Sequence, residues 1–180
     1  MKKSKFLPVL VASLALVAAL LCGCGVTVDK VNGYISKSLP SVKVLTQSIV
    51  AEDKGVTVYS LDKTVTVSGD EANVTVDEAT LGSDFSLQHN VSTSVSTKGE
   101  QLVLPVKLSD DVVESSVYEN DTLVCVVTSD KAGELFGSDV STDGDVRVVC
   151  NLSNNKLQQL TCTFTTATGK TVTLRVTCEY

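Results

Sequence analysis

Residues 145–180 carry the clearest strand pattern in the chain, DVRVVCNLSNNKLQQLTCTFTTATGKTVTLRVTCEY. Apolar and polar residues alternate along three parts of it, as they do in strands with one buried and one solvated face. The alternating apolar positions are Val146, Val148, Cys150 and Leu152, then Leu160, Cys162 and Phe164, and finally Val172, Leu174, Val176, Cys178 and Tyr180. This pattern predicts an antiparallel meander of three strands.

The first connection within this meander sets how its strands pair. A three-residue loop at 154–156 would place Cys150 opposite Leu160 and Val148 opposite Cys162. A slip of one residue would turn the apolar side chains to solvent, so this pairing is favoured. The resulting sheet has one apolar and one threonine-rich face, and the apolar face needs a covering layer.

The preceding part of the chain is also rich in valine and threonine, which favour strands. Valines two residues apart predict three short strands, at Val56 and Val58, Val65 and Val67, and Val74 and Val76. We expect turns between them at 62–63 and 69–71, further strands at 85–97, 101–108 and 123–128, and a polar loop at 110–120.

Helical periodicity occurs in two places. From Asp29 to Val50 apolar residues recur every three or four positions, and Pro40 interrupts them, which predicts one broken helix or two short ones. Ser129 would cap another short helix that Gly137 ends. The sequence therefore predicts an α+β, mainly β fold: a curved, half-barrel-like antiparallel sheet with N-terminal helices and a short helix before the last three strands.

Motifs in the C-terminal part resemble a known group of proteins. They are Leu135-Phe136-Gly137, the strand start Asp145-Val146-Arg147, the segment 162–173 and the ending Thr177-Cys178-Glu179-Tyr180. Over roughly the last 50 to 60 residues the pattern is similar to that of Gram-positive bacterial lipoproteins without an assigned activity and, more distantly, to half-barrel lipoprotein carriers. The resemblance implies a curved sheet wrapped around helices. Some members of the half-barrel superfamily carry lipids or lipoproteins in the concavity.

The N-terminus has the zones of an export signal. A basic start is followed by an apolar run over 6–21, which is shorter than the roughly 20 apolar residues of a spanning helix. The tetrapeptide Leu21-Cys22-Gly23-Cys24 resembles the lipobox of bacterial lipoproteins, with Cys24 as the modified residue. If Cys22 were the acceptor, the bulky Leu21 would occupy the slot beside the cut, where a small residue is required.

The lipobox resemblance implies a division of the chain and a location. We expect a signal peptide at 1–23, a lipidated N-terminus and short tether at 24–28, and a single domain at 29–180. Two acyl chains such as palmitate hold a domain stably on a bilayer, at about 0.8 kcal/mol per buried methylene. The domain would be anchored to the outer face of the cell membrane. The alternative is an ordinary secretory signal that leaves Cys24 free.

The charge balance limits the partners that the domain could bind. Three of the 15 basic residues would leave with the signal, so 12 remain against 21 acidic residues, a net charge of −9. Nucleic-acid binding needs Lys and Arg gathered on one face, so we expect no nucleic-acid partner. The same balance argues against electrostatic adhesion to anionic lipid.

Four cysteines lie in the predicted domain: Cys125, Cys150, Cys162 and Cys178. An exported domain permits disulfides, and the pairing above makes Cys150 and Cys162 diagonal neighbours. Buried free thiols are the alternative, since Cys often packs as a small apolar residue. No Cys-x-x-Cys spacing suggests a zinc site.

One acidic segment imitates the start of a calcium loop. Asp139, Ser141 and Asp143 alternate ahead of Gly144-Asp145, but Cys150 stands where the twelfth-position glutamate is expected. A polar turn into a strand explains the segment more simply. We expect no cofactor.

Neither a nucleophile nor a phosphate-binding motif can be assembled from the sequence. The single histidine, His89, is expected to be a solvated strand residue, and no Gly-x-Ser-x-Gly motif is present. We therefore expect that the protein is not an enzyme. Two functions remain: binding a lipid or other hydrophobic molecule between sheet and helices, or serving as a structural or protein-interaction domain of the cell envelope.

Overall fold

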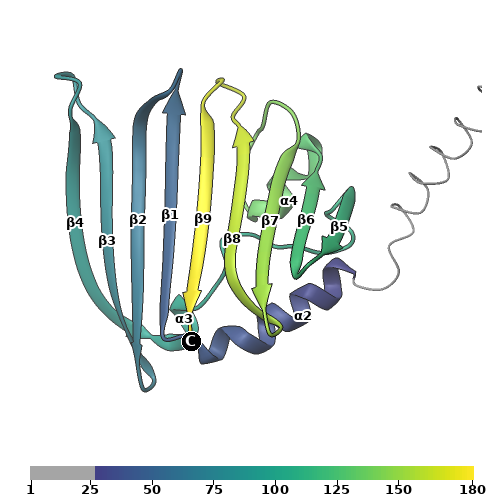
Figure 1. The fold of residues 1–180 in the computed structure, drawn as a ribbon. Helices are drawn as coiled ribbons and strands as arrows, with labels where there is room; N and C mark the ends of the chain where they lie inside the picture. Colours follow the sequence, from purple (N-terminus) through teal and green to yellow (C-terminus); the bar gives the residue numbers. More distant parts are fainter. Residues whose placement is uncertain (1–26) are drawn as a thin grey trace, which may run out of the picture.

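The computed structural model describes residues 27–180, which form one open antiparallel sheet with helices on one of its faces (Figure 1). The sheet order is β4-β3-β2-β1-β9-β8-β7-β6-β5. The strands are β1 (Val44–Asp53), β2 (Val56–Ser68), β3 (Glu71–Leu81), β4 (Leu87–Thr97), β5 (Ser115–Glu119), β6 (Thr122–Val127), β7 (Val146–Ser153), β8 (Lys156–Thr165) and β9 (Thr171–Glu179). Strands that follow one another along the chain are also neighbours in the sheet, except β4 and β5, which lie at its opposite edges. The two halves of the sheet are joined by the pairing of β1 with β9.

The helical elements are short. They are α2 (Val28–Ser38), the 3-10 turn η1 (Leu39–Ser41), α3 (Lys98–Gln101), the 3-10 turn η2 (Ser129–Lys131) and α4 (Ala132–Phe136). The Thr27 hydroxyl caps α2 by accepting a hydrogen bond from the Lys30 amide at 3.2 Å. Pro40 lies in η1, where its fixed φ and missing N–H suit the end of the α-helix.

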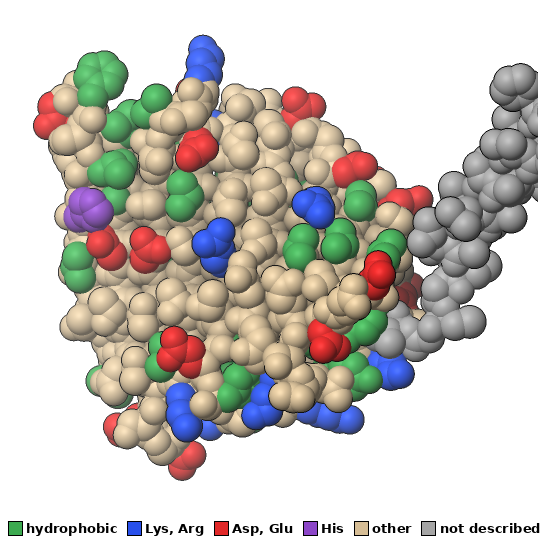
Figure 2. Space-filling view, in the orientation of Figure 1, with side chains coloured by type: hydrophobic (Ala, Val, Ile, Leu, Met, Phe, Trp, Pro, Cys, Tyr) green, Lys and Arg blue, Asp and Glu red, His purple; other side chains and the backbone are tan. Residues whose placement is uncertain are grey.

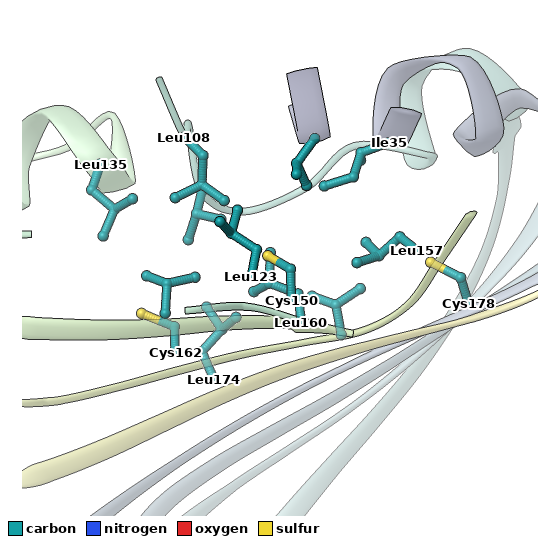
Figure 3. Packing of buried hydrophobic residues seen from close by; sticks show 14 of the residues in the cluster. Ile35, Leu108, Leu123, Leu135, Cys150, Leu157, Leu160, Cys162, Leu174 and Cys178 are labelled. Atoms are coloured by element: carbon teal, nitrogen blue, oxygen red, sulfur yellow. The ribbon is translucent and has the colours of Figure 1, made fainter. Parts of the chain in front are cut away.

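The hydrophobic core lies between the β6–β9 part of the sheet and a cover made of α2, the segment 102–113 and α4. In Figure 3, Ile35, Leu108 and Leu135 extend from these covering segments toward the side chains of the sheet. The inner face is the face that carries Leu160 and Cys178. The largest core side chains, all less than 2% exposed, include Ile35, Leu45, Leu123, Leu135, Leu157 and Leu160.

The β1–β4 part of the sheet has far less cover. Val65, Ala72 and Val74 are buried near the lower end of β2 and β3, where the core cluster also includes Leu102. β4 is exposed at every position except Ser96. The sheet therefore has a packed half and a half that is largely open on both faces.

The predicted C-terminal meander is confirmed, including the pairs Cys150 with Leu160 and Val148 with Cys162. The predicted three-residue loop is wrong in detail, because Ser153 pairs with Lys156 across a two-residue turn. Both turn residues, Asn154 and Asn155, have positive φ, at 51° and 58°. A bulge after Asn151 supplies the extra residue, so the pairing beyond it is the predicted one.

Two predictions for the first half of the chain are wrong. The helical pattern ends with η1, and the segment that was predicted to continue as a helix to Val50 is β1. The predicted turn at 62–63 lies in the middle of β2, which runs without a break from Val56 to Ser68. The turn at 69–71 is confirmed, since Gly69 has a φ of 66° between β2 and β3.

Two further differences concern the middle of the chain. The segment 101–108 is not a strand: α3 ends at Gln101, and the chain then crosses the inner face as an irregular segment. Lys107 donates its amide to the Leu135 carbonyl. The predicted loop at 110–120 contains the edge strand β5. The short helix before the last strands is confirmed, with Thr128 and not Ser129 as its N-cap and Gly137 at its end with a φ of 64°.

Candidate functional site

A cavity with a volume of about 690 Å³ lies at the end of the sheet beside α3. Four separate parts of the chain form it: the end of α2 with η1, the β2–β3 turn, the β4–α3 junction, and the start of the crossing segment. Its lining residues are Ser36, Leu39, Pro40, Asp70, Thr97, Lys98, Gly99 and Leu102. We call it the end cavity.

Local hydrogen bonds hold the walls of the end cavity in place. The Lys98 amide donates to the Asp70 carbonyl at 2.9 Å, which ties α3 to the β2–β3 turn. The Ser96 hydroxyl donates to the Glu100 carboxylate at 2.7 Å, and the pKa of Glu100 is lowered chiefly by this bond. The α3 wall is therefore fixed to β3 and β4.

The lining of the end cavity is mixed. Leu39, Pro40 and Leu102 supply apolar surface, whereas Asp70 and Lys98 supply one charge of each sign. Ligand sites usually have volumes of roughly 300 to 1,000 Å³ and combine apolar walls with a few polar groups. The end cavity fits a small amphiphilic molecule by this measure.

The layer between the sheet and the helices, where the sequence placed a hydrophobic ligand, is filled by side chains. Ile35 of α2 and Leu135 of α4 are at most 1% exposed, and so are Leu123 and Leu160 of the strands that they cover. No buried side-chain nitrogen or oxygen within 27–180 lacks a hydrogen-bond partner. The end cavity lies beside this packed layer and not within it.

A smaller cavity of about 360 Å³ lies between α2 and the β7–β8 turn. Lys37 and Lys156 line it together with Tyr34, Ser38, Ser41, Asn154 and Asn155. The Lys156 ammonium lies 4.5 Å from the centre of the Tyr180 ring. The Tyr180 hydroxyl donates to the Leu157 carbonyl at 2.9 Å, which holds the ring in position.

The acidic segment forms an exposed turn. Asp139, Ser141, Asp143 and Asp145 are all exposed. The Thr142 hydroxyl donates to the Gly144 carbonyl at 2.9 Å, and the Asp143 amide donates to the Thr165 carbonyl at 2.8 Å. Within residues 27–180, no three His, Cys, Asp or Glu side chains gather as a metal site would require.

The structure brings the four cysteines onto the inner face as buried free thiols. Cys125 and Cys162 flank Val148 from the two neighbouring strands, and Cys150 lies diagonal to both. Diagonal neighbours in a sheet are about 7 Å apart, whereas a disulfide needs Cβ atoms roughly 4 Å apart. Burial raises the pKa of Cys125, Cys150 and Cys162 to about 12 and that of Cys178 to about 11.

His89 lies on β4 and is exposed, as the sequence predicts. Its Nδ1 atom is 2.9 Å from a carboxylate oxygen of Asp77 on β3. Both side chains lie on the outer face, the face opposite the helices, and in Figure 2 the histidine is the purple group at the edge of the sheet.

Cys24 and the export signal lie outside the described residues. Between residues 27 and 180, the helices are too short or too polar to cross a bilayer. No sequence motif indicates the end cavity, because its walls come from four separate segments of the chain. The interruption at Pro40 was the nearest signal to it.

Comparisons with known proteins show no family. No protein-family model matches the chain, and no curated protein matches it. Among solved structures, a redesigned β-barrel bound to DFHBI has 12% identity and a TM-score of 0.25, over 78% of this chain and 97% of that one.

Two natural enzymes also match at low scores. A bifunctional dehydratase-cyclase domain in ambruticin biosynthesis has 10% identity and a TM-score of 0.21, over 78% of this chain and 76% of that one. The peroxisomal multifunctional enzyme type 2 from Drosophila melanogaster has 11% identity and a TM-score of 0.22, over 91% of this chain and 40% of that one. At these TM-scores the likeness carries no inference about fold, ligand or reaction.

Proposed function

We propose that the protein is an extracytoplasmic lipoprotein, held on the outer face of the cell membrane by acyl chains on Cys24. The proposal rests on the basic start, the apolar run and the tetrapeptide Leu21-Cys22-Gly23-Cys24. Because α2 begins at Val28, only three residues separate the anchor from the folded domain. The domain would then lie close to the lipid surface.

Metabolic labelling with a fatty-acid analogue tests the anchor. The wild-type chain and Cys22→Ala are expected to take up label, whereas Cys24→Ala is expected to lose it and to leave the membrane fraction. Cys22→Ala is the matched control, since it removes the neighbouring thiol by the same substitution. Label that persists in Cys24→Ala would refute the anchor.

We infer further that the domain binds a small amphiphilic molecule in the end cavity. The observation that carries this inference is a volume of about 690 Å³ with both apolar and charged lining. The packed layer between sheet and helices offers no comparable space. We infer a binding role for the end cavity because its lining includes no histidine or cysteine. The single histidine, His89, pairs with Asp77 on the outer face of the sheet.

A cavity-filling substitution tests the binding role. Gly99 lines the end cavity, and a Cβ atom built on it meets nothing within 4 Å, so Gly99→Phe adds a ring at the cavity wall without a close contact at Cβ. Gly33→Phe is the matched control, because its Cβ is equally free and Gly33 is not part of the cavity. Anilinonaphthalene sulfonate, which combines aromatic rings with an anionic group, is a suitable probe.

The expected result is saturable fluorescence enhancement in the wild type and in Gly33→Phe, with at least tenfold weaker affinity in Gly99→Phe. Both variants should unfold at the same temperature as the wild type to within a few degrees. Equal affinity in all three proteins, or no saturable binding to the wild type, would reject the cavity as the site. The chain would then be better described as a structural or protein-interaction domain of the envelope.

A further inference from the structure

The two edges of the sheet differ in how they are protected. β5 has five residues, includes Glu119, and follows directly on Glu114. β4 has eleven residues and contains no Lys, Arg, Asp, Glu or Pro. It pairs with β3 from end to end without a bulge. Proteins normally blunt an exposed edge strand with charges, prolines, bulges or short length, and β4 has none of these features.

Three hydrophobic side chains lie exposed on the outer face of β4. Leu87 is 38% exposed, Val91 61% and Val95 64%. Their spacing of four residues puts all three on one face, together with His89. In Figure 2, hydrophobic side chains lie above and below the purple histidine along this edge. The edge therefore combines free backbone groups with an apolar row.

The spacing of this row is symmetric about its middle member. Val91 lies four residues after Leu87 and four before Val95. If two β4 strands pair antiparallel around a twofold axis at Val91, Val91 meets its own copy and Leu87 meets Val95 on both sides. On the other face, Gln88 would meet Ser94 and Asn90 would meet Ser92. An unrelated strand would gain nothing from this symmetry.

We propose that the partner of β4 is a second copy of this chain, bound edge to edge with the twofold axis at Val91. The two sheets then form one continuous sheet of 18 strands, since each copy contributes nine. Both copies carry a net negative charge, so they repel least at an edge without acidic residues. Close to that edge, the Asp77 carboxylate is already paired with His89 at 2.9 Å.

Cysteine crosslinking on the full-length protein in membranes tests both the interface and its pairing. Across the axis, two Val91→Cys side chains would lie within disulfide reach, because opposite Cα atoms in a sheet are about 5 Å apart. Val117→Cys is the matched control: Val117 is 55% exposed, on the opposite edge strand β5. The four native thiols of the domain are buried and do not compete.

Crosslinking between chains with different cysteine substitutions tests the antiparallel register of the two β4 strands. Leu87→Cys alone should not crosslink, since the two copies of residue 87 would be about 27 Å apart, eight residues along the strands. Val95→Cys alone should not crosslink for the same reason. Coexpressed chains of different tag size, one with each substitution, should yield a mixed disulfide.

The expected result is a covalent dimer from Val91→Cys and from the Leu87→Cys and Val95→Cys mixture, with none from Val117→Cys. Val91→Lys should abolish the dimer in a bifunctional-reagent assay, because two ammonium groups would meet at the axis, whereas Val117→Lys should leave it unchanged. A monomeric Val91→Cys, or crosslinking to a different protein, would overturn the proposal. Neither outcome depends on the end cavity, so the two proposals fail separately.

Discussion

The four buried thiols should be almost inert while the domain is folded. The ordinary thiol pKa of 9.0 gives roughly 10% thiolate at pH 8, whereas a pKa of about 12, as for Cys150, gives roughly 0.01%. The thiolate is the reactive form, so ionisation alone slows modification about 1,000-fold. The side chain of Cys150 is also 0% exposed, so reaction should require opening of the structure.

The assay is reaction with a chromogenic disulfide reagent at pH 8, on a chain with Cys22→Ser and Cys24→Ser. We expect no fast phase in the folded protein and four equivalents of reaction in guanidinium. A single domain thiol that reacts within tenfold of free cysteine would refute the reasoning. So would a yield below four in guanidinium without reductant, because that would mean that a disulfide had formed.

The same pKa shifts make the fold sensitive to alkaline pH. Because the folded-state pKa values are raised, the thiols stay protonated in the folded protein while the unfolded chain begins to ionise near pH 9. The contribution of the protonated thiols to the free energy of unfolding is therefore fully present below pH 9. It is lost as the pH rises from 9 to between 11 and 12. At pH 10 the loss of folding free energy is about 1.4 kcal/mol per thiol, or roughly 6 kcal/mol for four. Urea unfolding at pH 8 and pH 10 measures it, and Cys162→Val should reduce the pH-dependent part by about a quarter.

Two smaller changes test the C-terminal hairpin and the contact between α2 and the sheet. Asn155 has a φ of 58°, so Asn155→Ala should destabilise the domain by about 1 kcal/mol, whereas Asn155→Gly should not. Urea unfolding measures both variants, and equal effects would contradict the turn geometry. Tyr180→Phe removes the hydrogen bonds to the Ser38 hydroxyl and the Leu157 carbonyl and should cost about 1 kcal/mol. Tyr118→Phe loses one exposed hydrogen bond to Asp121 and should therefore cost less free energy than Tyr180→Phe. A larger loss of stability in Tyr118→Phe would refute the stabilising role of the Tyr180 hydroxyl.

The strands that could be predicted are those with one buried and one solvated face. In β7, β8 and β9 the helices cover one face, so burial and sequence alternate together. In the uncovered β1–β4 half, the predictions of strands at Val74 and Val76 and at 85–97 are confirmed as β3 and β4, but the long strand β2 was divided in two by a false turn. Asp62 and Lys63 are tolerated in the middle of β2 because they remain accessible to water, and for that reason they resembled a turn.

The helical misreading of β1 has a specific cause. Leu45 and Ile49 are four residues apart, a spacing that places two side chains on one face of a helix and also on one face of a strand. Gln47 lies between them on the same face and removes the period-two signal. In 101–108 apolar residues occur at every second position, as in a strand, but the segment crosses the sheet without pairing with it. A local sequence pattern cannot predict whether a segment finds a strand to pair with. The end cavity could not be predicted, because tertiary packing alone brings its four segments together.

The place of β9 in the sheet bears on how the domain assembles. β1 and β9 pair over more than 100 residues of intervening chain, from Val44 with Glu179 to Glu52 with Thr171. Such long-range pairing carries a large loop-closure cost and slows folding. Until β1 and β9 pair, each half of the sheet has an additional exposed edge strand whose backbone groups can pair with other chains. The β1–β9 pairing therefore removes two edges at which the folding chain could aggregate.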